Sequence, residues 1–327
     1  MLGQRLCPRI LPAHYQIQYN HRMQTFSHLG GVYAAAITPI NPDFSPDYSA
    51  LPALLEFLHD RGCHGALLLG TTGEGPSFAP AERLELMRSA LHVRRLYPDF
   101  RLLAGTGTPS LSETIELTKA AFEIGMDGVV VLPPYYFRQA AEEGLHLWFS
   151  QVIQEAVPPG KVLLAYHIPR VSGVPLSIEL IVRLKSDYPD RFAGIKDSSG
   201  DPEHAARLGE TFGRELLILN GSDQLFSLAL QCGAMGCITA LGNLFSPDLR
   251  QVWDGYQRSE DTGYHQGSLI AYREVAENYQ PFPPLVKALL ARLYHFPFWT
   301  VRPPLLPLPN EAVDEAEAAL RSLWNND

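Results

Sequence analysis

Cysteine is scarce in this sequence, and the few that occur are not arranged to bind a metal. The 327 residues include four cysteines, Cys7, Cys63, Cys232 and Cys237, with no C-x-x-C pair and no histidine partner at zinc-site spacing. The 11 histidines are scattered, without the i, i+4 pair of a helical metal site. We therefore expect reduced core thiols, with neither a disulfide framework nor a bound metal.

Long apolar runs and an excess of positive charge are also lacking. No stretch approaches the about 18 uninterrupted apolar residues that a membrane span requires. The formal net charge is -9 without a run of like charge, which argues against nucleic-acid and membrane partners. Residues 1–29 have no apolar core or cleavage site of a signal peptide. We expect them to form a loosely ordered extension of a cytoplasmic protein, with Met23 as an alternative start.

From residue 31 onward, short apolar runs typical of strands alternate with segments of helical periodicity. The predicted strands are 31–37, 65–69, 101–104, 128–132, 162–166, 192–196, 216–219 and 235–239. The predicted helices between and after them are 48–60, 80–95, 111–125, 140–156, 177–187, 201–211 and 224–232. This alternation predicts an α/β fold with a parallel sheet.

The fold that suits eight such units is a (β/α)8 TIM barrel over residues 30–258. A doubly wound sheet is less suitable, because no G-x-G-x-x-G follows the first strand and the repeat never breaks. Three more helices, 264–279, 284–294 and 310–324, are separated by proline-rich joints. We expect residues 259–327 to form a C-terminal helical extension packed on the barrel, without an active site of its own.

Polar motifs follow the predicted strands, where barrel enzymes carry their active sites. They are G-T-T-G-E (70–74), P-P-Y-Y-F (133–137), Y-H-I-P (166–169), Lys196, N-G-S-D-Q (220–224) and T-A-L-G-N (239–243). The lysine ends the apolar run F-A-G-I, and lysine is almost never buried unless it is paired or functional. The other four lysines fall on predicted helices or before a strand, where solvent exposure explains them: Lys119, Lys161, Lys185 and Lys287.

A buried lysine at a barrel mouth suggests covalent chemistry. Desolvation lowers the pKa of a buried ammonium, and the neutral amine can form a Schiff base with a ketone. The alternative for Lys196 is a structural salt bridge with Asp197 or Glu74. Dehydration of the first adduct needs a proton shuttle, for which Tyr166 on the adjacent strand is the candidate.

Other polar groups could complete this site. Tyr136 and Thr71 could extend the proton relay, and Thr72 with the backbone amides around Gly70 and Gly73 could hold a carboxylate. Each has a plainer alternative: Tyr166 as a core aromatic residue, and the glycines as residues that permit a tight turn.

The motifs G-T-T-G-E, P-Y-Y, Y-x-I-P, G-I-K-D and G-A-x-G-x-I-T-x-x-G-N-x-F-x-P occur together and in order over residues 30–310. In this respect the chain resembles the dihydrodipicolinate synthase / N-acetylneuraminate lyase family of class I aldolases. The resemblance implies a Schiff base of Lys196 with pyruvate or another 2-oxo acid and Tyr166 as the general acid/base. It also implies Thr71 and Tyr136 in the proton relay and Thr72 on the carboxylate.

The resemblance further implies an assembly and a second half of the substrate site. In this family the tyrosine that matches Tyr136 can cross a subunit interface, which implies a homotetramer built from dimers. Asp223, Gln224 and Thr239 match positions that contact the rest of the substrate in the lyases. The resemblance also implies a reaction that needs no cofactor and no metal and whose second partner is an aldehyde.

The sequence departs from that of the synthases at the motif after the fifth predicted strand, which in the synthases resembles Y-N-x-P-x-R-T-G. This chain reads Y-H-I-P-R-V-S-G, so Val171 replaces the arginine that binds the aldehyde's carboxylate, Arg170 lies one residue early, and His167 replaces the asparagine. Phe137 also changes the pocket lining. We therefore favour a lyase that cleaves or forms a 4-hydroxy-2-oxo acid. The alternatives are a 4-hydroxy-tetrahydrodipicolinate synthase and a non-catalytic 2-oxo-acid sensor.

Overall fold

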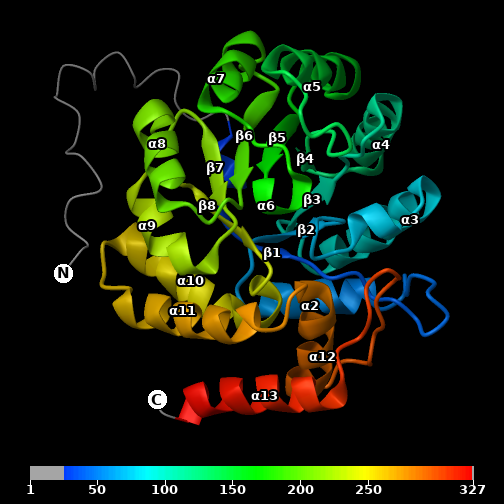
Figure 1. Ribbon diagram of the computed structural model, residues 1–327, viewed down its shortest axis with the longest axis vertical. Helices are drawn as coiled ribbons and strands as arrows, with labels where there is room; N and C mark the ends of the chain where they lie inside the picture. Colours follow the sequence, from blue (N-terminus) through cyan, green and yellow to red (C-terminus); the bar gives the residue numbers. More distant parts are fainter. Residues whose placement is uncertain (1–25, 326–327) are drawn as a thin grey trace.

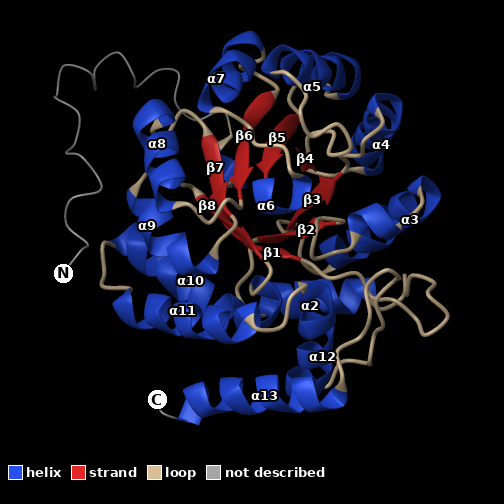
Figure 2. Cartoon of the chain, in the orientation of Figure 1, coloured by secondary structure: helices blue, strands red, loops and turns tan. Residues whose placement is uncertain are grey.

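The computed structural model describes residues 26–325, and its centre is a closed barrel of eight parallel strands. Each strand pairs with the next along the chain, and the last pairs with the first, as Figure 2 shows in red. The strands are β1 (Gly31–Ala35), β2 (Gly65–Leu68), β3 (Arg101–Gly105), β4 (Gly128–Val131), β5 (Val162–His167), β6 (Phe192–Asp197), β7 (Leu217–Asn220) and β8 (Gly236–Thr239). The predicted (β/α)8 barrel is confirmed.

Helices surround the barrel on its outer side (Figure 1). The main ones are α2 (Leu51–Asp60), α3 (Pro80–Ala90), α4 (Leu111–Ile124), α5 (Glu142–Ala156), α7 (Ile178–Asp187), α8 (Pro202–Phe212), α9 (Phe226–Gln231) and α10 (Gly242–Arg258). Short turns are η1 (Ser27–Leu29), η2 (Gly75–Ser77), η3 (Leu91–Arg95), η4 (Asp223–Leu225) and α6 (Pro169–Ser172). Side chains of Ser110, Ser177 and Asp201 accept backbone N–H groups at the first turns of α4, α7 and α8, which explains where these helices begin.

Two layers of apolar side chains hold the barrel together. The residues that face its interior include Tyr33, Leu67, Leu103, Val130 and Leu219, whereas a second, larger group packs between strands and helices. Ile195 belongs to this outer group. Because successive strand residues point to opposite faces, its neighbour Lys196 points into the barrel.

The predicted C-terminal helices are confirmed as α11 (Gly263–Glu277), α12 (Phe282–Tyr294) and α13 (Asn310–Asn325). They lie along one side of the barrel next to α10, in orange and red in Figure 1. The helix α12 begins before its predicted start at 284, because Pro283 and Pro284 fit the first turn, where no N–H donor is needed.

One prediction about this region is wrong. Lys287 on α12 is only 1% exposed, whereas solvent exposure was expected. Its partners, Glu74 and the carbonyl of Thr300, lie on other segments that the helix covers, so its burial could not be inferred from helical periodicity.

Cys63 and Cys237 are buried free thiols, and Cys232 is also buried. Cys7, Met23 and most of the predicted N-terminal extension lie outside the described residues. Within residues 26–325, no helix combines the length and apolar character needed to cross a membrane.

Candidate active site

Lys196 and Tyr166 are brought together by the pairing of β5 with β6. They are opposite each other in the strand register, and their exposed fractions are 2% and 4%. The Lys196 Nζ atom lies 4.2 Å from the centroid of the Tyr166 ring. The strand register therefore fixes an amine and a phenol side by side inside the barrel.

Thr71 joins this pair from the loop after β2. Its Oγ1 atom lies 3.3 Å from the Tyr166 hydroxyl, within hydrogen-bonding distance. The next residue, Thr72, is 7% exposed. The predicted Lys196, Tyr166 and Thr71 thus form one contiguous set contributed by three strand ends.

The loop that carries Thr71 has an unusual backbone. Leu69 and Glu74 both have positive φ, and the loop is closed by hydrogen bonds from the Glu74 and Gly75 N–H groups to the Thr71 and Gly70 carbonyls. A Cβ atom added to Gly75 would lie 2.0 Å from the Leu69 carbonyl oxygen. Glycine is therefore required there by a close backbone approach.

The Tyr166 phenol is polarised by its surroundings. Burial alone raises its pKa, but the adjacent Lys196 ammonium and hydrogen bonding with Thr71 outweigh that effect, so that the net pKa of Tyr166 is lowered. Hydrogen bonding with Ser198 also lowers the pKa of Tyr166. A phenol with a lowered pKa gives up and regains a proton more readily near neutral pH, as a proton shuttle must.

A small, partly enclosed hollow reaches the Tyr166 side chain. Its wall includes Leu67, Gly70 and Val130. Arg83 of α3 also lines it although this side chain is only 4% exposed, and its Nε–H donates to the Phe78 carbonyl. Sequence reasoning missed Arg83, because an arginine within a helix gives no signal that it turns inward.

Tyr136 does not join the site within one chain. Its side chain is 75% exposed and packs edge-on against Phe137, which is 73% exposed. Within the described residues, no hydrogen bond links Tyr136 to the Tyr166–Thr71 pair. The two rings form an exposed aromatic pair beside the barrel mouth.

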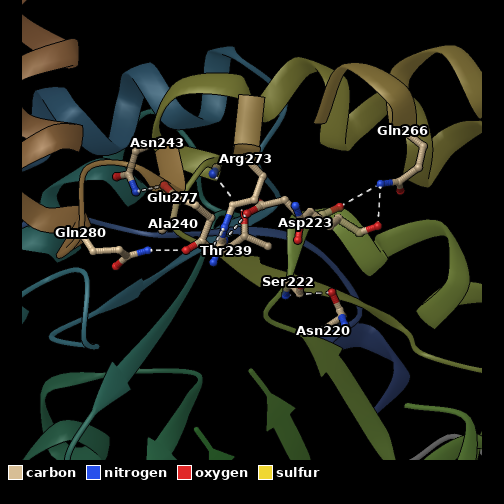
Figure 3. A network of polar contacts seen from close by, with 12 residues as sticks. Asn220, Ser222, Asp223, Thr239, Ala240, Asn243, Gln266, Arg273, Glu277 and Gln280 are labelled. Carbon is tan, nitrogen blue, oxygen red and sulfur yellow. Dashed lines mark hydrogen bonds and ion pairs between the residues drawn. The ribbon is translucent and has the colours of Figure 1, made fainter. Parts of the chain in front are cut away.

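Asp223 and Thr239 belong to a polar network at the ends of β7 and β8 (Figure 3), to which Gln224 contributes its backbone carbonyl. Asp223 is fully buried, and its Oδ2 atom accepts a hydrogen bond from Arg273 at 2.8 Å. Gln266 donates to the backbone carbonyls of Asp223 and Gln224. The Thr239 hydroxyl accepts the Gly242 N–H. Much of the polar capacity of these residues is therefore used within the protein.

The loop after β5 leaves Arg170 and Val171 exposed, with Val171 57% exposed on the short helix α6. The side chain that precedes this loop, His167, is instead buried. Neither Arg170 nor Val171 places a buried guanidinium beside the Tyr166–Lys196 pair.

His167 forms a buried cluster with Asp197 and His204, whose nearest polar atoms lie within 4.8 Å of one another. The two imidazole rings are stacked 4.6 Å apart. The His167 Nδ1 atom accepts the Leu176 N–H, so the proton of this neutral ring is on Nε2. A ligating imidazole usually has the opposite arrangement, with its second nitrogen donating, and the cluster is therefore poorly suited to hold a metal. No spacing in the sequence indicates this cluster, because its third member, His204, comes from α8.

The fold and the site define a class of protein: a barrel enzyme of the lyase type, in the aldolase group. The comparison with known families then identifies the family. The model of the dihydrodipicolinate synthetase family matches residues 28–323, and the chain belongs to this family. Its members are class I pyruvate aldolases.

Individual relatives agree with this membership. The chain is 40% identical over 295 residues to an "Uncharacterized DapA-like lyase" of Chloroflexus aurantiacus, covering 90% of this chain and 95% of that protein. It is 31% identical to the 4-hydroxy-tetrahydrodipicolinate synthase of Prochlorococcus marinus, over 90% and 95% of the two chains.

Solved structures give the same result. The prophage protein YagE of E. coli K12, determined in complex with pyruvate, matches with a TM-score of 0.84 at 25% identity, covering 90% of this chain and 98% of that one. The 4-hydroxy-tetrahydrodipicolinate synthase of Methylacidiphilum fumariolicum SolV matches with a TM-score of 0.82 at 29% identity, over 91% and 96%.

Proposed function

We propose that this protein is a metal-independent lyase that uses Lys196 to form a Schiff base with pyruvate and cleaves or forms a 4-hydroxy-2-oxo acid. The observation that carries the proposal is the contact of buried Lys196 with the Tyr166–Thr71 pair. The alternative, a structural salt bridge of Lys196 with Asp197 or Glu74, is weakened because Glu74 pairs with Lys287 instead. The pyruvate-bound YagE structure supports pyruvate as the 2-oxo acid.

The first half of the reaction builds an imine. The neutral Nζ of Lys196 attacks C2 of the 2-oxo acid, and the nitrogen loses a proton while the former carbonyl oxygen gains one. Tyr166 then donates a proton to this hydroxyl, which leaves as water, so that a protonated imine and the Tyr166 phenolate remain. The Thr71 hydroxyl, 3.3 Å from the Tyr166 oxygen, extends the relay and hydrogen-bonds to this phenolate. Thr72 and the backbone amides at Gly70 and Gly73 hold the carboxylate.

The second half breaks the carbon–carbon bond. The C4 hydroxyl gives a proton to the Tyr166 phenolate, the C3–C4 bond breaks, and its electron pair moves into the protonated imine to give an enamine and a free aldehyde. Protonation at C3 and addition of water then release pyruvate and Lys196. No cofactor takes part in this scheme, and the same steps in reverse perform the condensation.

Trapping with borohydride tests the Schiff base. Incubation with pyruvate and borohydride should add one reduced pyruvate to Lys196, as identified by intact mass and peptide mapping. The variant Lys196→Met should give no adduct, whereas the control Lys119→Met, at an exposed position on α4, should give the wild-type mass gain. An adduct on another lysine, or none, would contradict the proposal.

Exchange of the pyruvate methyl protons in D₂O tests the role of Tyr166 without knowledge of the aldehyde. We expect Tyr166→Phe to slow this exchange by roughly 10²- to 10⁴-fold, because the proton shuttle is removed, while the trapped adduct persists. An unchanged exchange rate would exclude Tyr166 from the mechanism. Trapping without any exchange or turnover in the wild type would favour the 2-oxo-acid sensor.

The alternative substrate pair is pyruvate with aspartate semialdehyde. The identity with the Prochlorococcus synthase favours it, and the exposed Val171 in place of the carboxylate-binding arginine argues against it. Condensation rates with aspartate semialdehyde and with uncharged sugar aldehydes distinguish the two. We expect the uncharged aldehydes to react faster.

We also propose a homotetramer built from dimers, in which Tyr136 enters the partner's site. The exposed Tyr136–Phe137 pair beside the hollow supports this assembly. We further propose that residues 30–258 form the catalytic unit, that residues 259–327 form its helical region, and that the enzyme works in the cytoplasm. Asp223, Gln224 and Thr239 are proposed to act on the distal part of the substrate.

A further inference from the structure

A second lysine, Lys287 of α12, is buried as deeply as the candidate nucleophile. Its exposed fraction is 1%, against 2% for Lys196. A fully buried ammonium is costly unless partners satisfy it. The proposed mechanism gives Lys287 no role, so its partners must explain why it is there.

The partner that carries charge is Glu74, the last residue of the G-T-T-G-E motif. The Lys287 Nζ atom lies 2.5 Å from Glu74 Oε1 and 2.6 Å from the Thr300 carbonyl oxygen. The second Glu74 oxygen accepts the Arg302 N–H at 2.9 Å. Both oxygens of this buried carboxylate are thus held by the C-terminal region, and we call Lys287, Glu74, Thr300 and Arg302 the C-terminal clamp.

Glu74 is also a backbone element of the catalytic loop. Its φ of 56° is in the left-handed region, which a non-glycine residue adopts only when its surroundings hold it there. Its N–H donates to the Thr71 carbonyl at 3.1 Å. The conformation of Glu74 therefore sets the position of Thr71, three residues earlier.

Arg302 strengthens the same attachment from outside. Its guanidinium donates to the Ser77 carbonyl and to Glu82 at the start of α3, and it lies over the Phe78 ring. The loop from residue 74 to residue 82 is thereby held along its length by one arginine.

We propose that Lys287 is a positioning residue: through the C-terminal clamp it fixes the loop that places Thr71 against Tyr166. This inference rests on the proposed Schiff-base function and extends it to the C-terminal helices. The Thr71–Tyr166 separation of 3.3 Å is near the upper limit for a hydroxyl pair, so a small shift of the loop breaks the relay.

The clamp also links the relay to pH. Burial lowers the pKa of Lys287 from its usual 10.5 to about 8, and the charged groups that act on it are Glu74, which opposes this shift, and Arg302, which adds to it. Above that pH Lys287 is neutral and the Glu74 carboxylate loses its counter-charge. The loop should then loosen, and the proton relay should slow.

The test measures exchange of pyruvate methyl protons as a function of pH in wild type, Lys287→Met and the surface control Lys119→Met. We expect Lys287→Met to slow exchange by about 100-fold per folded molecule, the size of effect that a misplaced loop gives, while borohydride still traps pyruvate on Lys196. Wild type and the control should lose activity as pH rises through about 8. Lys287→Met should lack this decline.

Other outcomes separate the proposal from its alternatives. If Lys287→Met is less stable but its folded fraction keeps the wild-type rate and pH profile, the clamp is only structural and the proposal is wrong. If Lys287→Met does not fold, the double variant Glu74→Gln/Lys287→Met removes both buried charges together, and a wild-type rate and profile in it would overturn the proposal equally. Absence of an adduct in wild type would instead contradict the proposed function.

Discussion

His167 is a buried imidazole whose environment opposes protonation. Burial first, and the neighbouring His204 second, lower the pKa of His167 from its usual 6.5 to about 4. Between these two values the unfolded chain binds a proton that the folded protein does not. The free energy of unfolding should therefore decrease as the pH falls from 7 toward 4.

Replacement of this histidine tests the expected acid sensitivity. From the two pKa values, the unfavourable protonation of His167 should lower the free energy of unfolding by about 2 kcal/mol between pH 7 and pH 5. The variant His167→Asn should lose about 2 kcal/mol less than the wild type over the same pH range. Urea unfolding at the two pH values measures it. His64, whose pKa burial also lowers to about 4, remains in the variant and leaves a residual slope. The same loss in variant and wild type would show that His167 is protonated in the folded state.

The two buried lysines show what could be read from single residues in the sequence. Lys196 was identifiable because it ends an apolar run at a place where barrel enzymes do chemistry. Lys287 follows an equally apolar stretch, but in a helix an inward-facing lysine looks the same as an exposed one until the opposite wall is known. Its carboxylate partner is 213 residues away, a contact that only the closed fold creates.

At the scale of single helices, side-chain caps fix where the elements begin. Ser177 accepts the Leu180 N–H at the start of α7 and also bonds to the Glu142 carboxylate on α5. The Ser177 hydroxyl thus satisfies one free backbone donor and ties two neighbouring helices together. Both contributions are lost when the hydroxyl is removed.

We expect Ser177→Ala to lower the free energy of unfolding by about 1 kcal/mol, the usual cost of losing a helix cap. The matched control is Ser112→Ala, at an exposed position in the first turn of α4, which should change stability by less than about 0.5 kcal/mol. Chemical denaturation of both variants provides the comparison. Equal losses of unfolding free energy in the two variants would mean that the Ser177 cap stabilises the protein no more than an exposed serine does.

The elements themselves were predictable because apolar periodicity and capping residues act locally. The exact ends were less predictable: Ser110 and Ser112 are both residues that cap helices, and only the structure shows that the cap of α4 is Ser110. Polar networks were not predictable at all. The Asp223–Arg273 pair joins η4, which follows β7, to α11 across 50 residues, and no local pattern distinguishes a buried arginine on α11 from an exposed one.

At the scale of the whole molecule, this pair attaches the C-terminal helices to the barrel (Figure 3). Arg273 bonds to fully buried Asp223 and to Glu277, so loss of the guanidinium leaves a buried carboxylate without a counter-charge. Arg273→Met should cost roughly 3 kcal/mol of unfolding free energy. The double variant Asp223→Asn/Arg273→Met should recover most of it. Additive losses in this double-mutant cycle would argue that the two side chains act independently.

The exposed Tyr136 raises the question of which subunit it serves. In the described chain, the Tyr166–Thr71 pair lies in the barrel while Tyr136 and Phe137 are mostly exposed. A two-fold dimer places the same surface of each subunit against the other, so each tyrosine can enter the opposite site. Under the proposed assembly, a site needs Lys196 from one subunit and Tyr136 from its partner.

Mixed dimers of two defective variants distinguish the two arrangements. Lys196→Ala lacks the nucleophile and Tyr136→Phe lacks the phenol, so each alone should exchange pyruvate protons poorly. In a dimer of one subunit of each kind, one of the two sites regains both groups if Tyr136 acts on the partner. Random co-assembly should then restore about one quarter of the wild-type exchange rate. Activity no higher than the mean of the two parents would place Tyr136 in its own chain's site or outside the reaction, and would contradict the shared-site dimer.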